Sequence, residues 1–366
     1  MEKRSIQAGN IFGLDRKELE AIAVAQAHPG YRGRQLFRAL YSRRVRNFDS
    51  ITELGKDFRK SLAGRYRIDY PSVERTYESS DGAVRYLLGL EDGRRVETVY
   101  MPDKNRTTVC VSSQAGCAVD CQFCFTALRG LERNLSPGEI LGQLYILLEA
   151  GRELPKARLN VVFMGMGEPL LNFRSVMKAV QVLGDPEGLG IPLRRITIST
   201  AGIVPGIVKL GREPVRPKLA VSLNASRDQE RTALMPLNRK YPLGELLAAC
   251  RSYPLRPWER LTFEYVLLDG INDSDSDARR VVELVRGIRC KINLIPYNPG
   301  PGLPYRPSPL ARVLAFQQIL TRRHIPAFIR VSRGQDISAA CGQLRLADAT
   351  GSSLLDQVPD LHSPMA

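Results

Sequence analysis

The chain has 366 residues, of which 43% are hydrophobic and 25% charged, a composition typical of a globular protein and not of a disordered or fibrous one. Its 53 Lys and Arg outnumber its 38 Asp and Glu, and the formal charge of +15 favours a polyanionic partner such as nucleic acid, although a charge that only aids solubility fits it too. No apolar run approaches the roughly 20 residues of a membrane span, and the N-terminus lacks the apolar segment of a secretory signal. We therefore expect a cytoplasmic protein without membrane contact.

The cysteine count also bears on function. Seven cysteines, an odd number in a chain without an export signal, indicate reduced thiols used for metal binding or catalysis and argue against a disulfide framework. Four of them fall between residues 110 and 124.

The N-terminal part of the chain reads as a small helical unit. Residues 14–27 and 34–46 have apolar positions at helical spacing, separated by the breaker pair Pro29-Gly30. Between residues 31 and 70 there are eleven Lys or Arg and four Asp or Glu, so positive charge is concentrated here. We predict a basic helical accessory domain over residues 1–70 that binds RNA.

The next segment is expected to form strands. Residues 73–101 contain strand-like runs broken by the turn pairs Asp81-Gly82 and Asp92-Gly93, so we predict a β-meander linker over residues 71–106. From residue 107 short β-rich runs alternate with amphipathic helices, as in an α/β fold with a parallel, partial (β/α)6 barrel over residues 107–345. The six runs are TTVCVSS, LNVVFMG, RRITIST, KLAVSLN, LTFEYVLL and CKINLIPYN.

Several local features refine this outline. Ser136 and Glu139 flank Pro137 as a capping box at the start of a helix. Residues 297–309 are rich in Pro and Gly and predict a long loop, followed by a helix near 309–324 and a strand in AFIRVS. Residues 346–366 are expected to form a flexible tail.

Cys117, Cys121 and Cys124 follow a C-x3-C-x2-C spacing on one tight loop after the first barrel strand. Three soft ligands suit iron–sulfur chemistry or zinc. Structural zinc sites generally take four protein ligands, whereas a cluster held by three cysteines leaves one iron open to a substrate. The spacing, with Phe123 before the third cysteine, resembles the radical S-adenosylmethionine superfamily, which implies a [4Fe-4S] cluster and S-adenosylmethionine. A zinc loop completed by Cys110 or Cys341 is the alternative.

Other polar residues fall at or just after the predicted strand ends, where ligands collect in a parallel α/β fold. The run FMGMGEPLLN resembles the glycine-rich motif of the superfamily and implies that Gly167 and Glu168 contact S-adenosylmethionine. Taken alone, each of the remaining polar residues also fits a capping or turn role. We predict cofactor contacts at Ser199, Ser222, Leu223, Asn224 and Asn298.

A narrower resemblance covers residues 95 to 344. The chain resembles the RlmN/Cfr family of adenosine methyltransferases, and within that family its runs are more similar to members that methylate C2 of adenine than to those that methylate C8. The matching runs, in order, are CVSSQAGCAVDCQFC, FMGMGEPLLN, ITISTAG, VSLNA, RTALMPLNRKYPL, EYVLLDGIND, CKINLIPYNP and RGQDISAACGQL.

The resemblance implies roles for single residues. Cys341 is expected to carry the methyl group from one S-adenosylmethionine while a second supplies the radical, two per turnover. Cys110 is expected to resolve the protein–RNA adduct through a transient Cys110–Cys341 disulfide. Glu97 matches the family's proton acceptor, although an ion pair with an arginine such as Arg85 fits it nearly as well. Cys250 and Cys290 are interpreted as core residues.

The expected partners follow from charge and resemblance together. The family acts on 23S rRNA in the peptidyl transferase centre and, in many members, on tRNA at the adenosine 3′ of the anticodon. Chemistry on a stacked base requires its extrusion into the barrel mouth. We further expect an electron donor such as flavodoxin or ferredoxin, and a monomer. The alternatives are a C8 methyltransferase and a non-catalytic RNA-binding protein with a zinc loop.

Overall fold

The computed structural model describes residues 9–155, 158–300 and 302–344. The tail predicted over residues 346–366 lies outside these ranges.

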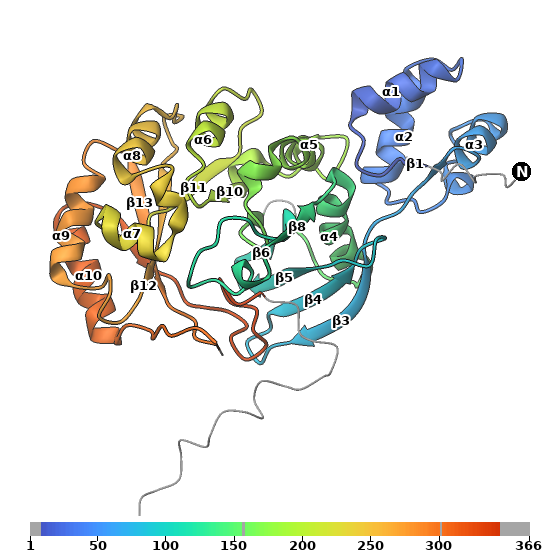
Figure 1. The fold of residues 1–366 in the computed structure, drawn as a ribbon. Coiled ribbons are helices and arrows are strands. Elements are labelled where there is room, and N and C mark those ends of the chain that lie inside the picture. The colour runs from blue at the N-terminus through green and yellow to red at the C-terminus, as the bar shows by residue number, and fades with distance from the viewer. Residues whose placement is uncertain (1–8, 156–157, 301, 345–366) are drawn as a thin grey trace, which may run out of the picture.

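One large sheet forms the body of the protein (Figure 1). Its strands are β3 (Ser72–Glu78), β4 (Val84–Gly89), β5 (Arg95–Asp103), β6 (Arg106–Cys110), β9 (Leu159–Phe163), β10 (Ile196–Thr200), β11 (Lys218–Ser222), β12 (Leu261–Leu267), β13 (Cys290–Pro296) and β14 (Ala327–Ile329). They lie in the order β14-β13-β12-β11-β10-β9-β6-β5-β4-β3. Pairing is parallel from β6 to β14 and antiparallel from β3 to β6. The open parallel part is the expected partial barrel.

Helices cover the outer face of the parallel strands (Figure 1). They are α4 (Pro137–Glu149), α5 (Phe173–Gly184), α6 (Val204–Gly211), α8 (Leu243–Ser252), α9 (Asp275–Leu284) and α10 (Leu310–Arg322). Helix α7 (Asp228–Leu234) lies instead at the carboxyl ends of β10 and β11. Short 3-10 helices lie at Phe48–Ser50, Ala127–Arg129, Pro169–Asn172, Leu193–Arg195 and Pro236–Arg239. Within the described ranges, no helix is long and apolar enough to cross a membrane.

The N-terminal unit contains α1 (Arg16–Ala25), α2 (Tyr31–Tyr41) and α3 (Lys56–Ala63). A short parallel pair, β1 (Gly9–Asn10) with β2 (Tyr66–Arg67), closes it. Helix α1 lies within the predicted range 14–27, whereas α2 starts before and ends before the predicted range 34–46, and α3 was not predicted. It forms because Phe58 and Leu62, one turn apart, are both buried.

Side-chain alternation decides which face of each strand meets the helices. In β12, Phe263 and Tyr265 are fully buried in the apolar core, whereas Glu264 points to the opposite face. Register places Glu264 between Ser222 of β11 and Asn293 of β13. The inner face of the curved sheet is therefore polar near the strand ends, while the outer face is hydrophobic.

The main expectations of the sequence are confirmed. All six β-rich runs form parallel strands, and α4 starts with the predicted capping box of Ser136 and Glu139. The β-meander also forms, but β5 pairs directly with β6, so it continues the barrel sheet. This pairing was not predicted. The hairpin signals define the turns that join β3 to β4 and β4 to β5, but they do not say which strand pairs with the free edge of β5.

The N-terminal unit packs closely against α4. An aromatic cluster joins Phe12, Tyr41 and Tyr70 to Tyr145 of α4, and Tyr145 donates a hydrogen bond to the carbonyl of Tyr41 (2.6 Å). A Cβ at Gly138 would lie 2.4 Å from the carbonyl oxygen of Phe12. Glycine at this position therefore permits the backbones to touch.

Ion pairs complete this docking. Arg16 contacts Asp185 (2.5 Å), and Arg38 pairs with Glu187. Lys178 of α5 contacts Glu18 of α1 (2.5 Å). Part of the positive charge that the sequence suggested for RNA therefore holds the protein's own units together.

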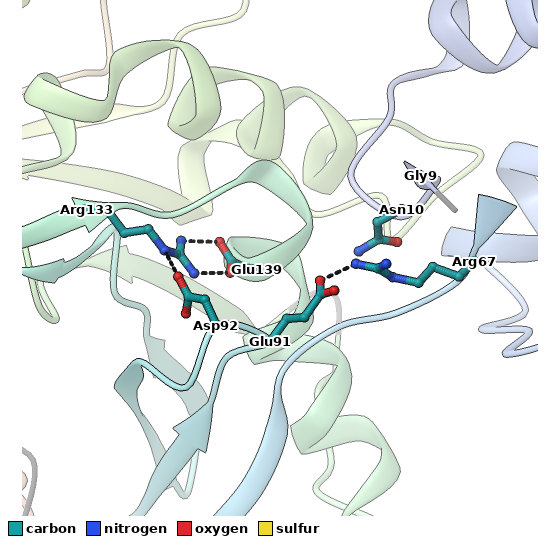
Figure 2. Close-up of a pocket in the computed structure, with 7 residues that line it drawn as sticks. All are labelled: Gly9, Asn10, Arg67, Glu91, Asp92, Arg133 and Glu139. Atoms are coloured by element: carbon teal, nitrogen blue, oxygen red, sulfur yellow. Dashed lines mark hydrogen bonds and ion pairs between the residues drawn. The ribbon is translucent and has the colours of Figure 1, made fainter. Parts of the chain in front are cut away.

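A surface pocket of about 560 Å³ opens at the same junction (Figure 2). Its charged groups satisfy one another, since Arg133 contacts Asp92 (2.5 Å) and Glu139 (2.7 Å) while Arg67 pairs with Glu91. None of the predicted site residues lines it. The pocket therefore belongs to the contact between the units.

We predict that Gly138→Ala lowers the melting temperature, even though Ala is the better helix former. The added methyl group meets the Phe12 carbonyl, and such overpacking costs about 1–3 kcal/mol. Thermal unfolding provides the measurement. The matched control is Gly244→Ala in α8, where a Cβ meets no atom within 4 Å. If both variants are equally stable, the close backbone contact is wrong.

Candidate active site at the carboxyl ends of the parallel strands

The predicted site residues gather at one edge of the sheet. Cys110 and Ser222 are the last residues of β6 and β11, and Ser199 is the penultimate residue of β10. Glu168 follows β9 and Asn298 follows β13. Because the strands are parallel and adjacent, these five positions converge at their carboxyl ends.

The cysteine loop, residues 117–124, lies between the strands of a small hairpin, β7 (Gln114–Gly116) and β8 (Leu131–Asn134). The Cys117 amide donates to the carbonyl of Gly130 (2.9 Å), and the Cys124 amide donates to the carbonyl of Cys121 (3.0 Å). The Gln122 amide donates to the carbonyl of Leu234 in α7 (2.9 Å). The loop is thus fixed at its base, across its turn and against α7.

The three thiols of this loop lie in a poorly solvated environment. Burial raises the pKa of Cys117 to about 12 and also raises the pKa values of Cys121 and Cys124. Mutual repulsion among the three sulfurs adds to the rise for Cys121. The thiols are therefore close enough to interact, and a cationic ligand is needed to hold them as thiolates.

The glycine-rich motif after β9 lies directly beside the cysteine hairpin. Gly167 has a φ of 97°, and a Cβ there would lie 2.5 Å from Gln114 of β7. The Glu168 amide donates to the Gln114 side chain (2.8 Å), and its carboxylate accepts from the amide of Ala201 (2.7 Å). Burial raises the pKa of Glu168 to about 7. This buried carboxyl group suits an ammonium group as its partner.

Other predicted cofactor contacts have structural roles of their own. Asn224, at a φ of 56°, accepts a hydrogen bond from the Val266 amide (2.9 Å). The Leu223 side chain is fully buried, its amide donates to the Glu264 carbonyl (2.9 Å), and its carbonyl accepts from Arg231 (3.0 Å). The Asn298 side chain donates to the carbonyl of Cys341 (3.3 Å). Ser199 and Ser222 are half-buried on the inner face.

The loop that carries Cys341 is bound to the cysteine loop. The Phe125 amide donates to the carbonyl of Gly342 (2.9 Å), and the Thr126 hydroxyl donates to the carbonyl of Leu344 (2.7 Å). Phe125 and Thr126 directly follow Cys124, and Gly342 and Leu344 lie just after Cys341. The backbone therefore couples Cys124 to Cys341.

The Cys341 thiol lies near enough to Cys110 to affect its pKa. Each of the seven cysteines, all within the described ranges, is a free thiol. Burial raises the pKa of Cys110, and the neighbouring Cys341 raises it further. Burial of the sulfur also raises the pKa of Cys341 to about 11, although the residue lies on an exposed turn. Cys250 and Cys290 are buried in the core, as predicted.

Glu97 forms the ion pair that the sequence allowed. Arg85 contacts its carboxylate at 2.5 Å, and both side chains are buried. Val99, two residues further along β5, is paired with Cys110, so Glu97 and Cys110 share one face of the sheet. The role of Glu97 as proton acceptor stays a prediction.

Sequence reasoning missed a latch that anchors the Cys341 loop to the β3–β4 turn. Asp336 accepts hydrogen bonds from the Ser79 hydroxyl (2.6 Å) and the Ser80 amide (3.0 Å). In return Asp81 accepts from the Gly334 amide (2.9 Å) and from Arg333 (3.0 Å). The Ser79 hydrogen bond is the main cause that lowers the pKa of Asp336.

Glu264 was missed as well. It accepts a hydrogen bond from Asn293 (2.9 Å), burial raises its pKa, and its charge in turn raises the pKa of Cys341. The only signal in the sequence was a glutamate within the strand-forming run LTFEYVLL. The alternation of the strand does not say whether such a glutamate has a function.

Comparisons with known proteins agree with this geometry. Residues 111–282 match the model described as the Radical SAM superfamily, and residues 9–68 match the ribosomal RNA large subunit methyltransferase N-terminal domain. A relative from Koribacter versatilis, named "Probable dual-specificity RNA methyltransferase RlmN", is 52% identical over 334 residues, which cover 87% of this chain and 96% of the relative. The dual-specificity RNA methyltransferase RlmN of Syntrophobacter fumaroxidans is 48% identical over 330 residues, with 89% and 95% covered.

The chain belongs to the RlmN family. Its fold supports the assignment, because a radical SAM methyltransferase from Sphaerobacter thermophilus matches with a TM-score of 0.85 and 47% identity over 92% of this chain and 99% of the other. This RlmN-family chain therefore has the radical SAM fold expected from its sequence.

Members of this family use a [4Fe-4S] cluster and S-adenosylmethionine, two per turnover. The residues present fit both groups, since one loop supplies three interacting thiols and Glu168 supplies a buried carboxyl group. Within the described ranges no three Cys, His, Asp or Glu side chains are already arranged around a metal position. The cysteines that hold a [4Fe-4S] cluster bind separate irons, so their three thiols need not converge on one position.

We predict that Asp336→Asn loosens the Cys341 loop. The Asn side chain has one acceptor oxygen in place of two, so it cannot accept from both Ser79 and Ser80, and losing a hydrogen bond to a charged group costs about 1.5–3 kcal/mol. Backbone amides of residues 334–344 should exchange with deuterium at least about tenfold faster, as measured by mass spectrometry.

The control for this variant is Asp103→Asn, because Asp103 pairs with Arg106 on the surface at 3.6 Å and does not contact the Cys341 loop. Equal protection of residues 334–344 in the two variants would show that the latch does not hold the loop.

Proposed function

We propose that the protein methylates C2 of adenosine in 23S rRNA and in tRNA. The observation that carries the proposal is the backbone contact between Phe125 and Gly342, which brings the methyl-accepting thiol Cys341 to the edge of the cysteine loop. The RlmN relatives, named for dual-specificity RNA methylation, and the match to a ribosomal RNA methyltransferase N-terminal domain support the substrate class.

Carbon 2 of adenine lies between two electron-withdrawing nitrogens and does not attack a methyl donor as an ordinary nucleophile. The cluster and S-adenosylmethionine, when bound, supply the methyl group and the radical chemistry that avoids this difficulty. Cys117, Cys121 and Cys124 would hold the cluster. The cofactor would be oriented by Gly167 and Glu168 together with Ser199, Ser222, Leu223, Asn224 and Asn298.

The chain's own cysteines complete the reaction. Cys341 carries the methyl group as a thioether and joins protein to RNA in the adduct. The Cys110 thiolate then attacks the Cys341 sulfur and forms a disulfide. The electron pair of the broken sulfur–carbon bond stays on the methylene carbon, which takes up a proton to become the methyl group of the product. The electrostatic contact between the two thiols supports this pairing. Glu97, on the same face as Cys110, accepts the proton of the base carbon.

The N-terminal unit, with limits near residues 1–70, binds folded RNA in this proposal. Arg38 and Arg46 contact the barrel through Glu187 and Glu149, so phosphate contacts fall to other arginines. Arg44 is exposed at a positive φ on the turn after α2 and is the first candidate. The enzyme would act as a monomer in the cytoplasm. An electron donor such as flavodoxin or ferredoxin would reduce its cluster.

Nucleoside analysis tests the reaction. Reconstituted enzyme, S-adenosylmethionine and a reductant should convert adenosine of 23S rRNA fragments and of tRNA to 2-methyladenosine, measured by mass spectrometry against authentic standards. Detection of 8-methyladenosine would assign the protein to the C8 methyltransferases of the RlmN/Cfr family. Modification of rRNA alone would remove tRNA from the proposed substrates.

Cysteine variants test the covalent route. Cys110→Ala should trap a protein–RNA adduct that migrates slowly on a denaturing gel, because no thiol resolves it. Cys341→Ala should abolish both methylation and trapping, and Cys250→Ala, which alters a buried core thiol, should trap nothing. Loss of activity without an adduct in Cys110→Ala would refute the resolving role.

A further inference from the structure

Arg231, on α7, is the largest fully buried side chain of the described structure, with 0% of its surface exposed. Transfer of a cation from water into a protein interior costs several kcal/mol unless an opposite charge compensates it. Its neighbours in the sequence, Glu230 and Thr232, gave no hint of this burial.

The guanidinium is held by neutral oxygens. Its Nε donates to the carbonyl of Leu223 (3.0 Å), and Nη1 donates to the side chain of Asn238 (3.0 Å). Nη2 donates to the carbonyls of Ala201 (2.7 Å) and Ser222 (3.0 Å). These bonds join the loops after β10 and β11, but they add no net negative charge.

Within the described ranges, no carboxylate oxygen lies within 4.0 Å of an Arg231 guanidinium nitrogen, so Arg231 forms no ion pair. Burial lowers the pKa of Arg231 to about 10, so the group stays charged at neutral pH. Among the groups that oppose this shift, Cys121 comes first, followed by Asp228 and Cys250. Of the groups that raise the pKa of the buried guanidinium, a thiol of the cysteine loop thus has the largest effect.

The backbone ties the two elements together. The Gln122 amide donates to the carbonyl of Leu234, one turn after Arg231 in α7. Cys121 and Phe123 pack on the small apolar cluster that contains Leu234 and Met235. The cysteine loop and the cation therefore keep a fixed relation to each other.

We propose that Arg231 is the buried counter-charge of the cysteine loop and raises the reduction potential of the cluster held there. The proposal rests on the assignment of Cys117, Cys121 and Cys124 as cluster ligands. One-electron reduction adds negative charge, which a nearby cation stabilises strongly because few water molecules screen it. Glu168 also acts on Cys121 and carries the opposite charge when ionised, and the ammonium group of S-adenosylmethionine would neutralise it.

Two variants of Arg231 separate the effect of its charge from the effect of its hydrogen bonds. Arg231→Lys keeps the charge and loses most of the hydrogen bonds, whereas Arg231→Gln loses the charge as well. Each protein is reconstituted anaerobically, its iron and sulfide are counted, and its midpoint potential is measured by a redox titration followed by electron paramagnetic resonance. No RNA is needed.

Arg231→Gln should shift the ratio of reduced to oxidised cluster at least about tenfold toward the oxidised form, a drop of about 59 mV for a one-electron couple. Arg231→Lys should stay close to the parent protein. The matched control is Arg216→Met, because Arg216 is also buried but pairs with Glu259 (3.5 Å) before the start of β11, at the opposite end of that strand. It should lower the melting temperature and leave the potential unchanged.

The remaining outcomes also decide. If Arg231→Gln fails to take up iron while Arg231→Lys takes it up, the charge is required and the proposal stands. If the Gln and Lys variants both fail to load, or both load with equal potentials, Arg231 acts only through its hydrogen bonds and the proposal is wrong. Failure of the proposed RNA methylation would appear separately, in the nucleoside analysis of the parent protein.

Discussion

The site depends on one backbone contact, the hydrogen bond from the Phe125 amide to the Gly342 carbonyl. Phe125 follows Cys124 and Gly342 follows Cys341, so a single peptide-to-peptide bond sets the spacing between two reactive segments. Each segment has further support, the first from α7 and the second from the Asp336 latch. In the proposed reaction a one-carbon unit passes from the Cys341 thiol to the base, and this separation would have to be constant, because small misplacements of reacting atoms are costly.

The geometry of the parallel sheet explains why the site could be outlined from the sequence. Strand runs and the turns after them are encoded locally, by alternation and by turn-forming residues, and parallel order brings their carboxyl ends together. Ser199, Ser222 and Asn298 follow from this rule, whereas Cys110 and Glu168 were assigned through the resemblance to known families. The capping box at Ser136 is equally local and was correct.

The rest could not be predicted because it depends on contacts between distant segments. The hydrogen bond from Ser79 to Asp336 joins residues 257 positions apart, and no local pattern announces it. From the sequence, Glu97 fitted either a proton acceptor or an ion pair with an arginine such as Arg85, and only the structure shows that the ion pair forms. Arg231 looks like an ordinary helix residue, and only the tertiary structure shows that loops from two strands surround it.

The glycines of α4 have a consequence for how the molecule is divided. Gly138 touches the Phe12 backbone, and a Cβ at Gly142 would lie 2.6 Å from Tyr70 and Pro71. The accessory unit and the barrel thus share an interface fitted at the level of main-chain atoms. Such a unit is not an interchangeable module: on a barrel whose equivalent helix carries larger side chains at these two positions, it would not dock.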